Sequence, residues 1–228
     1  SWQLKLEKHL RFLEETGFSR HEITFDVNTD EFVLGEDMAI SRVDVEEYMK
    51  QGEATQGRRH QRRSAYIVSS TRVVNIKYYL DTTVPASWRA AIAQAIVEWN
   101  AVNGTTLFLS QVTESASADV RVNGINVPAA SWIARAYLPT FTGAPGTIIT
   151  VNTYYNYLDA GRKLFAMAHE MGHTFGLTHT NQTTGTLIPG TPVSDPGSVM
   201  NSVVLPWKGF TLYDQVAVQV LYPAVEPG

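Results

Sequence analysis

The chain has 228 residues, a formal net charge of −4 and no cysteine, so disulfides and thiolate metal ligands are excluded. A hydrophobic content of 44% can support a packed core, but no apolar run approaches the ~20 residues that span a bilayer. No basic face of the kind that binds nucleic acid is present. The sequence does not begin with a charged-then-apolar leader, so we expect any targeting peptide to have been removed or to lie outside it.

The charges are unevenly distributed along the chain. Residues 1–51 carry 6 Lys+Arg and 12 Asp+Glu, net −6; residues 52–63 carry four Arg and one Glu, net +3; residues 64–228 carry 8 and 9, net −1. We therefore expect an acidic N-terminal segment, an exposed basic linker and a nearly neutral main domain. The linker contains one apolar residue, Ala54, and has two interpretations: a processing site that a protease cuts, or a solvated spacer.

The acidic segment predicts small amphipathic elements. They are a helix over 2–15, a hairpin of strands at 21–26 and 31–34, an acidic turn at 35–37, and a short helix from a Ser41 cap to about residue 51. Because they can bury little apolar surface, we expect them to lie on the main domain rather than to hold a core alone.

The main domain predicts five strands and three helices. β-branched and aromatic runs indicate strands at 73–80, 107–112, 119–123, 131–138 and 147–152. Pro85 opens a helix to about residue 103 that carries one apolar stripe. Asp159 can cap a second helix, and the last helix covers about 211–221. A long irregular stretch rich in Gly and Pro separates these two helices.

The second of these helices carries the pattern HExxHxxGxxH. His169 and His173 are four residues apart, so they project from one helix face and can grip one metal ion. Glu170 sits beside the first ligand, and Gly176 can take the positive φ that ends the helix and brings His179 round. Three protein ligands leave one coordination position open, as in a catalytic zinc site. The alternative, surface histidines on a polar helix, is disfavoured because residues 61–228 hold no other histidine.

The chain resembles the metzincin metallopeptidases, and most closely the bacterial dual-action HEIGH metallopeptidases. The residues that carry the likeness are the zinc motif with Thr174, Gly190-Thr191-Pro192, and Ser198-Val199-Met200-Asn201. The resemblance implies an α+β fold with a twisted mixed sheet, a long backing helix, the zinc helix, a Met-turn and a C-terminal helix. It also implies a Zn²⁺ cofactor and an enzyme that is secreted or lies in the periplasm or at the bacterial cell surface.

Two positions refine this likeness. Met200 sits where that clan has its Met-turn beneath the metal, although it could also be an ordinary apolar filler. Astacins and serralysins carry a tyrosine ligand two residues past that Met, and this chain has Ser202 there. The resemblance therefore does not imply a tyrosine switch.

The N-terminal segment resembles the inhibitory segment of astacin-type proenzymes, in which an aspartate on a Gly-Asp turn fills the fourth zinc position. Here Leu34-Gly35-Glu36-Asp37-Met38 approximates that pattern with one residue exchanged. The likeness implies that Asp37 is a latency switch, with Glu36 as the alternative ligand. The same turn could instead be only the polar end of a hairpin.

Together these features predict a monomeric zinc endopeptidase that is made as a latent proenzyme and acts on proteins or peptides. Glu170 would serve as the general base toward a zinc-activated water. We expect an extended substrate to pair with residues 131–138, and residues 203–210 to wall a side-chain pocket. Two alternatives remain: a catalytically silent zinc-containing binding protein, and a hydrolase of non-peptide amides. No calcium loop is recognisable.

Overall fold

The computed structural model describes residues 1–55, 66–180, 188–192 and 194–225. Most of the predicted linker lies outside these residues, so its processing stays a prediction. Among the described residues, the helices are too short or too polar to cross a membrane.

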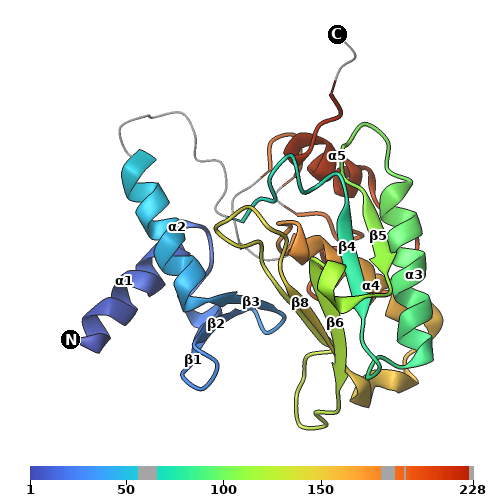
Figure 1. The fold of residues 1–228 in the computed structure, drawn as a ribbon, viewed down its shortest axis with the longest axis horizontal. Helices are drawn as coiled ribbons and strands as arrows, with labels where there is room; N and C mark the ends of the chain where they lie inside the picture. Colours follow the sequence, from blue (N-terminus) through green and yellow to red (C-terminus); the bar gives the residue numbers. More distant parts are fainter. Residues whose placement is uncertain (56–65, 181–187, 193, 226–228) are drawn as a thin grey trace.

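One mixed sheet runs through the N-terminal segment and the main domain (Figure 1). Its eight strands follow the order β1-β2-β3-β7-β8-β6-β4-β5. In chain order they are β1 (Ile23–Asp26), β2 (Glu31–Leu34), β3 (Met38–Ser41), β4 (Ile76–Leu80), β5 (Leu109–Val112), β6 (Val120–Ile125), β7 (Ala134–Tyr137) and β8 (Ile148–Asn152). The helices are α1 (Trp2–Glu15), α2 (Arg42–Thr55), α3 (Ala86–Asn100), α4 (Ala160–Thr174) and α5 (Leu212–Leu221), with short 3₁₀ turns at Arg20–Glu22, Ser115–Ser117 and Thr153–Tyr157.

The junction between the two parts of the sheet is the pairing of β3 with β7. The pairing is parallel and joins Met38 to Ala136 and Ala39 to Tyr137. On its other side β7 pairs antiparallel with β8. The edge of β7 that would otherwise be exposed is therefore covered by a strand from the N-terminal segment.

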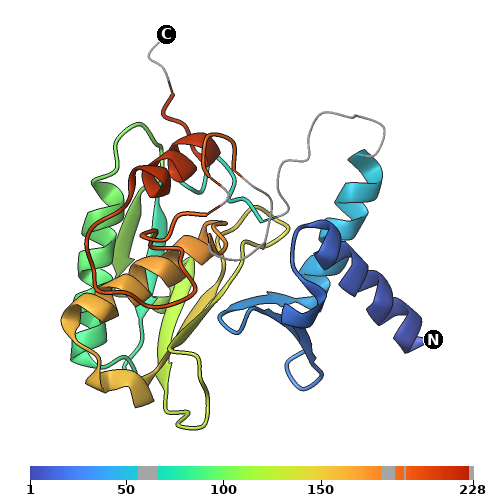
Figure 2. The ribbon, with the colours of Figure 1, turned by 180° about the vertical axis from the view of Figure 1, so that it is seen from behind.

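The main core lies between the sheet and the helices α3 and α4, which pack against each other. Figure 2 shows α4 in front of the sheet in that view, with α5 above it. Trp88, Ile92 and Trp99 of α3 are fully buried. The Trp99 ring lies edge-on to Phe175, and its Nε1 donates to the Ala168 carbonyl oxygen at 3.1 Å. These contacts fix α4, which carries the histidine motif, against the backing helix.

A second hydrophobic cluster is built mostly by the N-terminal segment and completed by the main domain, as expected of a segment that does not hold a core alone. The cluster joins α1, α2 and the β1–β3 meander, and it also contains Tyr66 and Leu138 from the main domain. Tyr66 packs edge-on against Phe18 and Tyr48, and its hydroxyl lies 2.9 Å from Thr16 Oγ1. The segment thus combines a small core with an attachment to the main domain.

The predicted elements are present, and their ends differ in ways that have physical reasons. The strand predicted at 73–80 begins at Ile76, because turn hydrogen bonds to the Ser69 carbonyl hold the preceding residues. The strand predicted at 131–138 narrows to β7, and the helix predicted to residue 103 ends at Asn100. Strand β3 was not predicted, because its four residues follow an acidic turn and show no alternation.

Candidate metal centre and active site

Helix α4 presents the motif to the interior of the molecule. Asp159 caps it, with Oδ1 accepting from the Arg162 amide at 2.8 Å. His169, Glu170 and His173 are all buried, and all belong to one continuous buried stretch of the helix. The helix is held on several sides, so these side chains have little freedom to move apart.

Gly176 ends this helix and turns the chain toward the third histidine. Its φ is +100°, which a residue with a Cβ rarely adopts. A Cβ built there would lie 2.2 Å from the Tyr66 carbonyl oxygen, so the site also requires glycine for space. The turn brings His179 to the imidazoles of α4, with its ring 5.1 Å from each of the other two.

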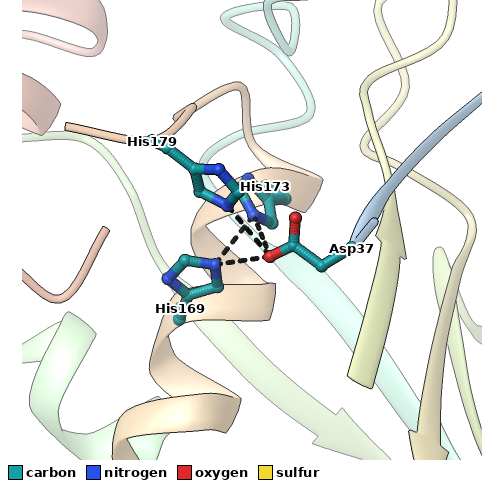
Figure 3. A group of neighbouring side chains, drawn as sticks. All are labelled: Asp37, His169, His173 and His179. Carbon is teal, nitrogen blue, oxygen red and sulfur yellow. Dashed lines mark hydrogen bonds and ion pairs between the residues drawn. The ribbon is translucent and has the colours of Figure 1, made fainter. Parts of the chain in front are cut away.

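The three imidazoles converge on one point (Figure 3). His169 Nδ1 lies 2.7 Å from the Val199 carbonyl oxygen, and His173 Nδ1 lies 2.7 Å from the Leu177 carbonyl oxygen. A carbonyl only accepts, so each Nδ1 carries the proton and each Nε2 keeps its lone pair. The two Nε2 atoms lie 3.0 Å apart. Burial lowers the pKa of His173 to about 4, so that imidazole is neutral at neutral pH.

Asp37 completes this group from the N-terminal segment. Its Oδ2 lies 2.7 Å from His169 Nε2, 3.1 Å from His173 Nε2 and 3.0 Å from His179 Nε2. Burial opposes ionisation of Asp37, but the imidazoles around it outweigh burial and hold its pKa well below the usual range. The neighbouring carboxylate, Glu36, instead accepts from Ser131 Oγ at 3.2 Å.

The turn that carries Asp37 has an unusual backbone. Gly35 and Glu36 both have a positive φ, +58° and +72°. Glu36 has a Cβ, and this conformation costs it on the order of 1 kcal/mol. The turn is fixed by three hydrogen bonds to other parts of the chain: Gly35 N to the Glu22 carbonyl at 2.9 Å, Ala136 N to the Asp37 carbonyl at 2.8 Å, and Arg135 Nε to the Glu36 carbonyl at 2.5 Å.

The four ligand atoms, three imidazole nitrogens and one carboxylate oxygen, fit a zinc ion. The three Nε2 atoms and the carboxylate oxygen lie within 4.8 Å of one another. In a tetrahedral zinc site with bonds of ~2.0–2.1 Å, neighbouring ligand atoms lie about 3.3 Å apart, close to these separations. Electron-rich atoms packed so closely repel one another unless a cation lies among them. Neutral imidazole and carboxylate are the protonation states that bind zinc.

Glu170 lies next to the first histidine and is 3% exposed. Its Oε2 has no hydrogen-bond partner among the described residues. Burial, together with the nearby Asp37 carboxylate, raises the pKa of Glu170 well above its usual range. A buried carboxyl oxygen without a partner is expensive to maintain, and such groups are found where a protein moves protons.

The turn after the metal motif lies directly under α4, where the Met-turn is expected. A Cβ at Gly172 would lie 2.6 Å from Met200 Sδ, so Met200 packs against the backbone between the two helical histidines. Asp214 of α5 holds this turn, with Oδ1 accepting from Ser198 Oγ and Oδ2 accepting from the Val199 amide at 3.0 Å. The Val199 carbonyl in turn orients His169.

Asp214 and the Val199 and Leu177 carbonyls did not emerge from the sequence analysis. Thr211-x-x-Asp214 has the pattern of a capping box, and the structure forms that box at the start of α5. The pattern could have identified Asp214, but nothing local shows that its second oxygen reaches back to the Met-turn. Backbone carbonyls carry no sequence signal.

The two predicted substrate-binding stretches have different outcomes. Residues 131–138 contain β7, whose outer edge is covered by β3. Within residues 203–210, the Phe210 ring packs at a tilt against Trp99, with the ring centroids 4.1 Å apart, and Trp207 packs edge-on against Phe210. Trp207 and Phe210 therefore contribute to packing on the main core, whereas Val203 is 60% exposed. The wall of the side-chain pocket stays a prediction.

The sequence matches a known family over most of this region. Residues 32–184 match the dual-action HEIGH metallo-peptidase family. The match includes Asp37, strands β3 to β8 and all three histidines. A search among curated proteins gave no match.

Solved zinc-protease structures resemble the fold. One structure of myroilysin superposes with a TM-score of 0.51 at 14% identity, covering 72% of this chain and 87% of that chain. A second myroilysin structure gives 0.49 at 12% identity, covering 71% and 88%. High choriolytic enzyme 1, a hatching enzyme zinc-protease from Oryzias latipes (medaka fish), gives 0.47 at 15% identity, covering 70% and 96%. At these identities the first likeness shows the fold alone.

The mixed α+β fold is that of solved zinc proteases, and the convergent histidines can hold the metal ion of a metallopeptidase. The family match is more specific, since it spans more than half of the sequence. The chain belongs to the dual-action HEIGH metallo-peptidase family, and its cofactor is zinc.

Proposed function

We propose that the protein is a metzincin-type zinc endopeptidase made as a latent proenzyme. The observation that carries the proposal is the convergence of three imidazole Nε2 atoms on the Asp37 carboxylate, which comes from a different part of the chain. His169, His173 and His179 would hold the zinc, and Asp37 would occupy the position that a catalytic site leaves open.

Glu170 is the general base in this proposal. When bound, zinc polarises a substrate carbonyl and lowers the pKa of a water in its open position toward ~7. Glu170 takes the proton of the attacking water and then gives it to the nitrogen of the leaving amine. The Val199 and Leu177 carbonyls keep two of the imidazoles in the tautomer that presents Nε2.

Latency would come from two blocks made by the β2–β3 hairpin, residues 31–41, whose turn carries Asp37. Asp37 displaces the attacking water, and β3 occupies the β7 edge along which an extended substrate would pair. Residues 1–51 then act as an intramolecular inhibitor of residues 64–228, and a cut within the linker at 52–63 releases them. Exposed polar segments of this composition are preferred sites of proteolytic nicking.

The test is hydrolysis of casein by the chain after limited proteolysis in the linker. Cleaved, zinc-loaded protein should hydrolyse casein, a chelator should abolish the activity, and added zinc should restore it. Glu170→Gln should keep zinc and the fold, because amide and carboxylate are nearly isosteric. Its turnover should fall by at least the ~10²–10⁴-fold typical of general-base loss.

Two outcomes would overturn the proposal. Zinc-dependent hydrolysis of amides but of no peptide bond would favour a non-peptide hydrolase. Stoichiometric zinc without any hydrolysis would favour a silent binding protein. Near-native turnover by Glu170→Gln would remove Glu170 from its assigned role.

A further inference from the structure

The cationic side chain of Arg135 faces the β2–β3 hairpin, whose strand β3 covers the edge of β7. Arg135 alternates with the buried Ala134 and Ala136, so its side chain lies on the opposite face of β7 from α4. Its guanidinium lies over the Trp132 ring at 4.7 Å, which orients its plane. Nε donates to the Glu36 carbonyl at 2.5 Å.

The two terminal nitrogens of Arg135, Nη1 and Nη2, make no such hydrogen bond within the described part of the chain. Among the described residues, no carboxylate lies within ion-pair distance of the guanidinium, and no acceptor is bonded to Nη1 or Nη2. Four acidic groups of the N-terminal segment act on its charge, namely Glu31, Asp37, Glu36 and Asp26, and its charge in turn acts on Glu170 of α4. Arg135 is partly buried, and burial lowers its pKa against these charges.

The neighbours of Arg135 on the main domain also hold acidic side chains of the hairpin. Ser131 Oγ donates to a Glu36 carboxylate oxygen at 3.2 Å, and the Tyr137 hydroxyl donates to the Glu31 carboxylate. The face of residues 131–137 therefore carries a hydroxyl, a guanidinium and a phenol, all directed at an acidic segment. These contacts are lost when that segment leaves.

We propose that Arg135, with Trp132 and Ser131, forms a substrate subsite for an acidic side chain in the released enzyme. The inference rests on the proposed peptidase function and deepens it by naming a substrate class. A guanidinium fork with both terminal nitrogens available matches a carboxylate bidentately, and the Trp132 face holds the fork in place. Because Arg135 bonds to the residue before Asp37, the acidic side chain lies next to the scissile bond, on the Ser131 side.

The step from the bound hairpin to a substrate follows from the geometry of β7. Strand β3 pairs with β7 through backbone hydrogen bonds from Ala136 N and Leu138 N, at 2.8 and 2.9 Å. These amides are available to any extended peptide once β3 has gone. A substrate on the same edge passes the same side chains, so Arg135 then meets a substrate residue instead of Glu36.

The experiment uses the full chain, cut in the linker and freed of its N-terminal segment. Quenched fluorescent peptides are compared in pairs that differ only by Glu or Gln, with the exchange made at each position flanking the scissile bond. At one of these positions the wild type should prefer Glu by roughly tenfold to a hundredfold in kcat/KM, as charge-assisted hydrogen bonds give. In Arg135→Gln the ratio should fall to near unity.

Two variants separate recognition from structure. Arg135→Glu should reverse the preference, favouring a Lys peptide over its Gln partner. Arg121→Gln is the matched control, because Arg121 on β6 also lies over an aromatic ring, that of Tyr79, but away from β7. Its Glu-to-Gln ratio should equal that of the wild type.

A binding measurement checks the same point without turnover. In the Glu170→Gln background, fluorescence anisotropy should give a lower Kd for the Glu peptide than for the Gln peptide, and Arg135→Gln should remove the difference. If cleaved wild type hydrolyses both peptides equally at every position, or if Arg135→Gln slows both by the same factor, Arg135 is only an anchor for the N-terminal segment. If neither peptide nor casein is cut, the proposed function itself fails.

Discussion

The two sides of the metal centre are built in different ways. The histidines come from a buried helix and the loop after it, inside the main core, and backbone carbonyls orient two of them. Asp37 comes from a short turn with two left-handed residues, attached to the main domain through the pairing of β3 with β7 and a small hydrophobic cluster. In the proposed function, holding zinc and blocking it are therefore separable properties, the first permanent and the second removable.

The largest expected effect comes from the histidine side of the metal centre, which belongs to the main domain. Replacing His173 with Ala removes a ligand whose ring is fully buried, and no described neighbour can substitute for it. Zinc affinity should fall by more than the ~10–100-fold seen when only a ligand's outer partner is lost. Elemental analysis after dialysis checks this. His21→Ala, outside the site, is the control, and a His173→Ala protein with full zinc and activity would refute the ligand assignment.

A matched pair of core substitutions separates the two regions. Leu34→Ala in the N-terminal cluster and Ile92→Ala in the main core each remove a fully buried aliphatic side chain, at a cost of ~2–5 kcal/mol. Thermal unfolding should show an early transition of the N-terminal segment for Leu34→Ala alone, with some activity before any cut. Ile92→Ala should lower the main transition and leave the uncut chain silent. Identical behaviour of the two variants would mean that the molecule unfolds as one unit.

Support of the Met-turn by Asp214 gives a smaller effect. Asp214→Asn leaves only one accepting oxygen for hydrogen bonds from Ser198, Val199 and Thr211, so a buried donor loses its partner. We expect a loss of ~1–3 kcal/mol in the free energy of unfolding, measured by denaturant titration. Asp159→Asn is the control, because Asn caps a helix about as well as Asp. A loss of the same size in both would show that the link to the Met-turn contributes nothing.

The sequence predicted the chemistry of the histidine side of the metal centre better than the way in which the N-terminal segment is attached. The spacing of His169, His173 and His179 with Gly176 determines a local geometry, and local geometry is what periodicity and turn residues encode. The pairing of β3 with β7 joins residues about a hundred positions apart and depends on backbone groups, which all residues share. Asp37 was found by likeness of a short turn, whereas Arg135 carries no pattern that singles it out.

The smallest expected effect is a pH dependence of stability that is confined to the N-terminal segment. His9 is buried, faces Glu46, Arg42 and Asp30, and burial lowers its pKa although Glu46 opposes this. Because its folded pKa lies below the unfolded value of ~6.5, its stabilising contribution is present above that pH and is lost as the pH falls through and below it. The N-terminal transition should therefore drop in temperature between pH 7.5 and 5.5 more in wild type than in His9→Gln. Equal slopes would exclude His9.

The measurement that tests the account most directly is the activity of the uncut, zinc-loaded chain. Asp37→Ala removes the carboxylate whose Oδ2 meets all three imidazoles, whereas Glu36→Ala removes one that bonds to Ser131. Both variants are assayed against a short fluorogenic peptide, with electrophoresis showing that the chain stays intact. The account predicts hydrolysis by Asp37→Ala and silence from wild type and Glu36→Ala. Silence from Asp37→Ala together with activity from Glu36→Ala, or silence from both, would contradict it.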